Sequence, residues 1–132
     1  MRDVGGFLGI LIIFSYGLTL LNFLLKWAYK NIKTQINKVP VLKTEYTRVM
    51  RFFIKYHRYF GFTTIVFILM HFSVQFSRYG ASLTGATAAI LMLTQVVVGI
   101  IGLKSSKKSK AWLWVHRALA IGIGIAILIH VN

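Results

Sequence analysis

The sequence contains no cysteine and almost no acidic residues. Without cysteine the chain forms no disulfide, thiolate metal site, iron–sulfur cluster or covalently attached c-type haem. Asp3 and Glu45 are its only acids, so catalysis by a pair of neighbouring carboxylates is excluded. Charged residues make up 14% of the chain and hydrophobic residues 57%, whereas soluble domains have about 25% charged and about 45–50% apolar residues. The composition therefore indicates an integral membrane protein.

Basic residues are the one kind of charge that the chain has in number. Its 16 Lys and Arg residues give a formal net charge of +14, which in a soluble protein would indicate nucleic-acid binding. They are bunched between long uncharged runs instead of covering a surface. We therefore expect no nucleic-acid partner.

Four apolar runs reach the length of about 20 residues that a hydrocarbon core of about 30 Å requires. We place the spans at about 4–25, 56–77, 80–103 and 111–131, with a basic segment at 26–55. No strand alternation is visible, so backbone hydrogen bonding in lipid leaves helices. The first run has no small-residue cleavage site and is interpreted as a retained helix. The prediction is all-α, a four-helix transmembrane bundle forming a single domain, residues 1–132.

The basic residues also predict the orientation of the chain. Fourteen of the 16 lie in Lys26–Arg58 and Lys104–Arg117, which by the positive-inside rule places these segments in the cytoplasm and both termini outside. The simplest such membrane is a prokaryotic cytoplasmic membrane. The basic segments either set topology and contact anionic lipid or dock an acidic partner. In the docking case, Arg48 and Arg51 should matter more than Lys107 and Lys108.

The first basic segment has helical character of its own. Ile32, Ile36 and Val39 recur at helical spacing among lysines, which predicts an amphipathic extension of the first span along the membrane surface. Pro40 is expected to end this extension.

The four histidines form two pairs with the same spacing. His57 and His71 lie in the second predicted span, His116 and His130 lie in the fourth, and each pair is separated by 14 residues. Fourteen residues make almost four helical turns and rise about 21 Å, so both members of a pair share one helix face. The two spans run in the same direction. We therefore expect His57 at the depth of His116 on the inner side, and His71 at the depth of His130 on the outer side.

Histidines at matched depths predict two sites with two imidazoles each. For a single intramembrane histidine, a hydrogen bond to another helix is the alternative. Zinc prefers four ligands in one cluster, whereas haem iron takes two axial imidazoles and its flat macrocycle fills the space between helices. We predict two b-type haems stacked between the second and fourth helices, with iron ligands His57 and His116 for the inner haem and His71 and His130 for the outer haem.

Five further residues are candidate parts of these cofactor sites. Arg58 and Arg117 directly follow the inner histidines, where they would either set topology or neutralise haem propionates. Gly85 and Gly99 are 14 residues apart in the third span, where a missing side chain would let a macrocycle approach the backbone. Gly61, four residues after the first histidine, has the same interpretation. Close helix packing is the alternative for all three glycines.

This pattern resembles the di-haem b-type cytochrome membrane domain, the four-helix core of the cytochrome b and ferric-reductase-like families. The shared feature is His, thirteen residues and His, on the second and fourth helices; the string His57-Arg58-Tyr59-Phe60-Gly61 is similar to the ferric-reductase-like group. The resemblance covers all four spans and implies electron transfer between two haems. The fused flavin and nicotinamide dehydrogenase usual in that group is not in these 132 residues. The quinol-site motif and paired first-helix glycines of quinol-oxidising cytochrome b are also missing.

Three functions are compatible with these features. The first, which we predict, is a membrane electron-transfer subunit of a larger redox complex, with a flavin, iron–sulfur or multihaem partner subunit. The second is a stand-alone reductase of quinone or ferric iron, although quinone chemistry needs a proton carrier that only the two acids could supply. The third is a haem-free anchor or assembly subunit whose histidines only pair helices. No catalytic residue is assigned.

Overall fold

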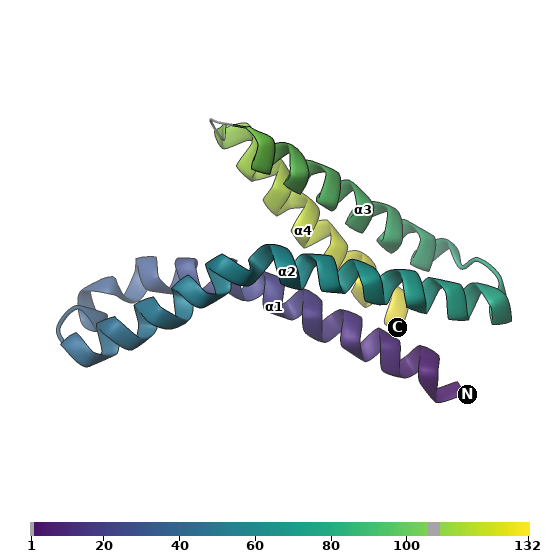
Figure 1. Cartoon of the computed structure of the whole chain (residues 1–132), viewed down its shortest axis with the longest axis horizontal. Coiled ribbons are helices and arrows are strands. Elements are labelled where there is room, and N and C mark those ends of the chain that lie inside the picture. The colour runs from purple at the N-terminus through teal and green to yellow at the C-terminus, as the bar shows by residue number, and fades with distance from the viewer. Residues whose placement is uncertain (1, 106–108) are drawn as a thin grey trace. The chain divides into compact units, whose positions relative to one another are not determined.

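A computed structural model describes residues 2–105 and 109–132, and over these residues the chain is helical apart from short connections. The helices are α1 (Arg2–Ile36), α2 (Pro40–Tyr79), α3 (Leu83–Lys104) and α4 (Lys110–Val131) (Figure 1). Each contains a stretch long and apolar enough to cross a membrane. The predicted all-α class and the four membrane-length helices are confirmed. Lys107 and Lys108 lie outside the described residues.

Large apolar side chains are exposed on all four helices. Phe14, Phe62, Ile90 and Leu128, one on each helix, all have more than half of their surface exposed. A soluble protein rarely leaves so much contiguous apolar surface in water. These helices are those of an integral membrane protein whose apolar surface contacts lipid.

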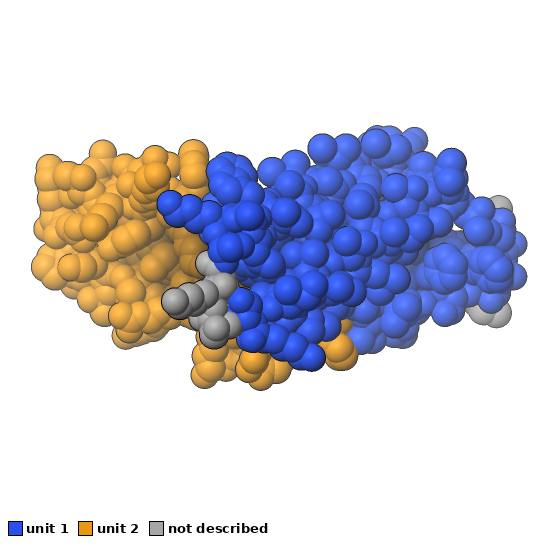
Figure 2. Space-filling view, turned by 90° about the horizontal axis from the view of Figure 1, so that it is seen from above, with its two compact units in different colours: residues 1–9, 65–132 blue, residues 10–64 orange. Residues whose placement is uncertain are grey.

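The chain divides into two compact units (Figure 2). Unit 1 comprises residues 1–9 and 65–132, and unit 2 comprises residues 10–64. The two long helices, α1 and α2, each contribute to both units.

Unit 2 is an antiparallel pair of helices held together by polar contacts. The hydroxyls of Thr64 and Ser15, both buried, hydrogen-bond each other at 3.0 Å. Nearer the connection, the Tyr46 hydroxyl donates to the Leu25 carbonyl at 2.7 Å, and the Tyr46 ring stacks on Tyr29 with centroids 5.6 Å apart. Small hydroxyl residues allow close helix contact in an apolar environment, where their hydrogen bonds have few competitors.

The connection between α1 and α2 corrects the expected role of Pro40. The first helix ends at Ile36, and Pro40 is the first residue of α2. The backbone N–H of Lys43 donates to the Val39 carbonyl at 3.1 Å, which is the first bond of the new helix. Proline suits this position because the N–H groups of the first helical turn have no acceptor within the helix. The N–H that proline lacks would therefore have made no helical hydrogen bond. The segment after Pro40 is therefore a helical continuation of the second span.

Unit 1 contains the antiparallel α3–α4 hairpin. Ser82 and Ser109 cap the two helices by accepting hydrogen bonds from the backbone N–H groups of Gly85 and Trp112, at 3.1 and 3.0 Å. The Trp112 indole lies against Gly102 and donates to the Val98 carbonyl at 2.7 Å. A side chain at Gly102 would occupy the position of the indole, so glycine is required there.

The turn before α3 also depends on a glycine. Gly80 has a φ of 74°, and its N–H donates to the Phe76 carbonyl at 3.0 Å. This is the left-handed conformation that commonly ends a helix. It terminates α2 at Tyr79, so α3 starts at Leu83 and not at the expected residue 80.

Candidate functional site: the histidine pairs

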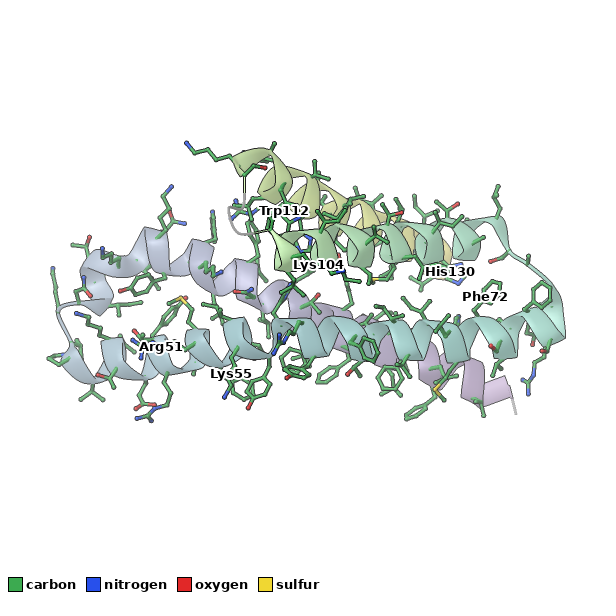
Figure 3. All side chains as sticks on the ribbon, turned by 45° about the horizontal axis from the view of Figure 1, so that its top comes forward. Arg51, Lys55, Phe72, Lys104, Trp112 and His130 are labelled. Carbon is green, nitrogen blue, oxygen red and sulfur yellow. The ribbon has the colours of Figure 1, made fainter. Side chains whose placement is uncertain are left out.

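Unit 1 brings together His71 of α2 and His130 of α4. Their ring centroids lie 6.3 Å apart, and the two ring planes are nearly perpendicular at 89°. Figure 3 labels His130 and Trp112, which lie toward opposite ends of α4. Both imidazoles are half-buried. This is the pair for which the sequence predicts a position on the outer side of the membrane.

A backbone carbonyl fixes the tautomer of His71. Its Nδ1 lies 3.1 Å from the carbonyl oxygen of Gly5, in the first turns of α1. A carbonyl can only accept a hydrogen bond, so Nδ1 carries the proton and Nε2 carries the lone pair. This is the arrangement found in metal-binding histidines, where the second nitrogen donates to a protein oxygen.

His130 is held by α3. Its Nδ1 lies 3.0 Å from the Thr84 hydroxyl. Because a hydroxyl can accept, His130 can adopt the same tautomer as His71, with its lone pair on Nε2. A Cβ at Gly85 would lie 3.0 Å from His130 Cε1 and 2.7 Å from the Ser82 hydroxyl. Gly85 therefore lets the His130 ring approach the backbone of α3.

The distance between the two ring centroids is close to that expected for two imidazoles bound to one metal ion. A metal bound at about 2 Å to one nitrogen of each ring, on opposite sides, would place the ring centroids roughly 6 Å apart. The observed distance is 6.3 Å. No three His, Asp or Glu side chains gather among residues 2–105 and 109–132. The donor set of this pair, two imidazoles from different helices, is one that would hold a haem iron.

His57 lies in unit 2 and has the same local chemistry. Its Nδ1 lies 3.2 Å from the Thr19 carbonyl of α1, which again places the proton on Nδ1. One turn further along α1, Asn22 has a side-chain oxygen that is buried and has no hydrogen-bond partner. A buried carbonyl oxygen without a donor is costly, so it marks a place where a polar group of a ligand or water would be stabilised.

His116 lies in unit 1 and is surrounded differently. Its ring stacks on Trp112, with centroids 5.3 Å apart and planes at 17°. The Gln95 amide donates to the His116 carbonyl at 2.9 Å, and its nitrogen lies 3.4 Å from His116 Nε2. The Gln95 side-chain oxygen is buried without a hydrogen-bond partner. In this structure an amide and an indole contact His116.

The remaining predicted site residues differ in their surroundings. The Arg58 guanidinium lies over the Tyr59 ring, 5.1 Å from its centroid, and is exposed, whereas Arg117 is half-buried. A Cβ at Gly99 would lie 4.0 Å from His116 Cε1, an ordinary contact distance, and a Cβ at Gly61 would meet nothing within 4 Å. Of the three predicted glycines, only Gly85 is tightly fitted to a histidine.

Sequence reasoning missed the groups that hold the imidazoles. The Gly5 and Thr19 carbonyls are backbone atoms, so no residue type signals them. Trp112 and Gln95 did carry a signal, because Trp112 is one turn before His116 and Gln95 is an amide within an apolar run. Thr84 looked like any hydroxyl residue of a membrane helix.

Family models, curated proteins and solved structures were all compared with this chain, and none matches it.

Proposed function

We propose that this chain is the membrane subunit of an electron-transfer complex and that it binds two b-type haems, each through two histidines. The observation that carries the proposal is the His71–His130 pair. Two imidazoles from different helices have ring centroids 6.3 Å apart, and each has its Nδ1 beside a protein oxygen that can accept a hydrogen bond. Bound haem supplies one-electron redox chemistry at these positions.

The second haem in this proposal uses His57 and His116. Support comes from the repeated 14-residue spacing and from the Thr19 carbonyl, which gives His57 the tautomer of a ligand. On the His116 side, ligation requires the Gln95 amide to turn away from Nε2. This rotation of the Gln95 side chain would also move its buried, unpaired oxygen to a position where it could accept a hydrogen bond.

The residues of the chain have separate tasks under this proposal. The four histidines hold the irons, and the Gly5 and Thr19 carbonyls and the Thr84 hydroxyl orient three of the rings. Arg58 and Arg117 would neutralise propionates. Apolar helices keep water from the sites. The proposed orientation is that of the positive-inside rule, with both termini outside and electrons passing between a soluble partner and the opposite side.

A haem-free anchor is the second candidate, and the surroundings of His116 favour it. A ring that stacks on Trp112 and contacts Gln95 joins α3 to α4 without any cofactor. If all four histidines act in this way, the protein is an assembly subunit.

The visible spectrum separates the two candidates. The full chain is expressed with added haem precursor, purified in detergent, and its haem is extracted and counted per chain. We expect two haems with the reduced spectrum of low-spin, six-coordinate b-type haem. In the double variant His71→Ala/His130→Ala we expect one, while Thr87→Ala, which removes a hydroxyl bonded only within α3, should keep both. A pure, folded protein without haem would establish the anchor.

A further inference from the structure

Unit 2 contains a basic helical hairpin, residues 26–55, made of the end of α1 and the beginning of α2. Figure 3 labels two of its side chains, Arg51 and Lys55, on α2. Glu45 is its only acid. Its basic residues are Lys26, Lys30, Lys33, Lys38, Lys43, Arg48, Arg51 and Lys55.

The basic hairpin is a direct continuation of two membrane-length helices. Neither α1 nor α2 is interrupted where the apolar run meets the basic one. From Leu25 to Ile36 the axis advances about 17 Å, and from Tyr56 back to Pro40 about 24 Å, at 1.5 Å per residue. The headgroup layer on one side of a bilayer is only about 6 Å thick. The tip of the hairpin therefore extends well beyond it.

Packing within the hairpin holds the two helices together, so that they continue their membrane-length parts as a pair. The Tyr46 hydroxyl donates to the Leu25 carbonyl at the base, and the Tyr29 and Tyr46 rings stack. Ile36, at the end of α1, is only 3% exposed. Charges near the tip, such as Lys43, thus lie farther from the headgroups than the screening length of about 8 Å at physiological salt.

The surface of the hairpin combines positive charge with exposed apolar side chains. Val41 is 73% exposed, and Leu42 and Phe52 are each 50% exposed. Along the same stretch of α2 lies a hollow of about 600 Å³, lined by Pro40, Lys43, Thr44, Thr47, Arg48 and Arg51. Arg48 already forms an ion pair with Glu45 at 2.8 Å. Lys43 and Arg51 are the other basic residues of the hollow.

We propose that the basic hairpin docks a soluble protein through an acidic face, whose carboxylates lie against Lys43 and Arg51. Exposed apolar residues beside these charges would contact the rest of that face. Complementary charge of this kind steers association and fixes the register of a complex. The inference rests on the proposed function for the partner's role as a redox protein, whereas docking itself needs no haem.

The alternative is that the basic hairpin binds the surface of an anionic membrane. A spin label at Val41→Cys distinguishes the two, because the chain has no other cysteine. In nanodiscs of either phosphatidylcholine or phosphatidylglycerol, we expect the label to be accessible to a water-soluble relaxation agent and not to oxygen dissolved in lipid. A label that moves to headgroup depth in phosphatidylglycerol would overturn the proposal in favour of lipid.

Binding of a defined acidic peptide tests whether Lys43 and Arg51 are the docking residues. The probe is a fluorescent peptide of alternating Glu and Ala, added to the full chain in phosphatidylcholine nanodiscs. We expect Lys43→Glu/Arg51→Glu to weaken binding about tenfold and to make it far less dependent on salt. The matched control Lys104→Glu/Lys110→Glu, which changes net charge equally at α3 and α4, should change affinity less than about twofold.

Equal losses in the two double variants would overturn the docking proposal, because any basic surface would then serve. The result is independent of cofactor content. Peptide binding that survives in a protein shown to lack haem would reject the electron-transfer function and keep the docking surface.

Discussion

The His71–His130 pair and His116 are both in unit 1, yet their imidazoles face different groups. The His71 and His130 ring centroids lie 6.3 Å apart, and the Nδ1 of each ring lies beside a carbonyl or hydroxyl oxygen. His116 faces an indole and an amide that contacts its Nε2. The same 14-residue spacing thus leads to two environments. Gly5, Thr84 and Gln95, on neighbouring helices, determine which polar group lies beside each imidazole.

Removing a ring from the His71–His130 pair should have the largest effect. For His71→Ala we expect haem content to fall from two per chain to one, because a single axial imidazole is left at that site. Haem extraction and the reduced absorption band measure this, with Thr87→Ala as the control. Two haems retained in His71→Ala, both with the six-coordinate low-spin spectrum, would show that the pair is not a haem site.

A side chain at Gly102 should disrupt the packing of Trp112, the residue that stacks on His116. In Gly102→Ala the new methyl group collides with the Trp112 indole, so we expect the free energy of unfolding to fall by about 1–3 kcal/mol. The matched variant Gly122→Ala adds a methyl group where nothing lies within 4 Å, and should be neutral or stabilising by up to about 1 kcal/mol. Thermal unfolding in detergent measures both. Equal effects would contradict the packing of Trp112 on Gly102.

The two predicted glycines of α3 offer a finer comparison. A methyl group at Gly85 approaches His130 to 3.0 Å, whereas one at Gly99 lies 4.0 Å from His116. In haem-free protein, Gly85→Ala should cost about 1 kcal/mol of stability and Gly99→Ala nothing measurable. If a macrocycle lies against both glycines, each variant should also bind haem more weakly in a titration. Unchanged haem affinity in Gly99→Ala would assign that glycine to helix packing.

The smallest effect is expected at Thr84. Thr84→Val keeps the shape and removes the hydroxyl beside His130 Nδ1, so His130 loses its fixed orientation at a cost of about 1 kcal/mol. Thr84→Ser should restore wild-type behaviour. A redox titration should show a shift for one haem in the valine variant only, since the partner of an axial histidine tunes its basicity. Identical titrations for both variants would remove Thr84 from the site.

Prediction from sequence succeeded where one physical signal dominated. Long apolar runs identified the four helices. The equal 14-residue spacing of the histidines on two spans that run in the same direction anticipated that His71 and His130 lie close together. Helical structure after Pro40 was not predicted, because residues 40–55 mix charged and apolar side chains without a clear apolar face. The contacts of Thr84 and Gln95 depend on the register of α3 against α4, which no single residue reveals.

The two carbonyls that orient histidines of α2 are themselves 14 residues apart on α1. Gly5 accepts from His71 and Thr19 from His57, so α1 repeats the spacing of α2 in the opposite direction. In an α-helix, deletion of one residue rotates all the following residues by about 100° about the helix axis and shifts them by about 1.5 Å along it. A deletion between Gly5 and Thr19 would leave only one of the two acceptors in place. This stretch of α1 should therefore tolerate changes at its exposed side chains, such as Phe14, but not a change of length.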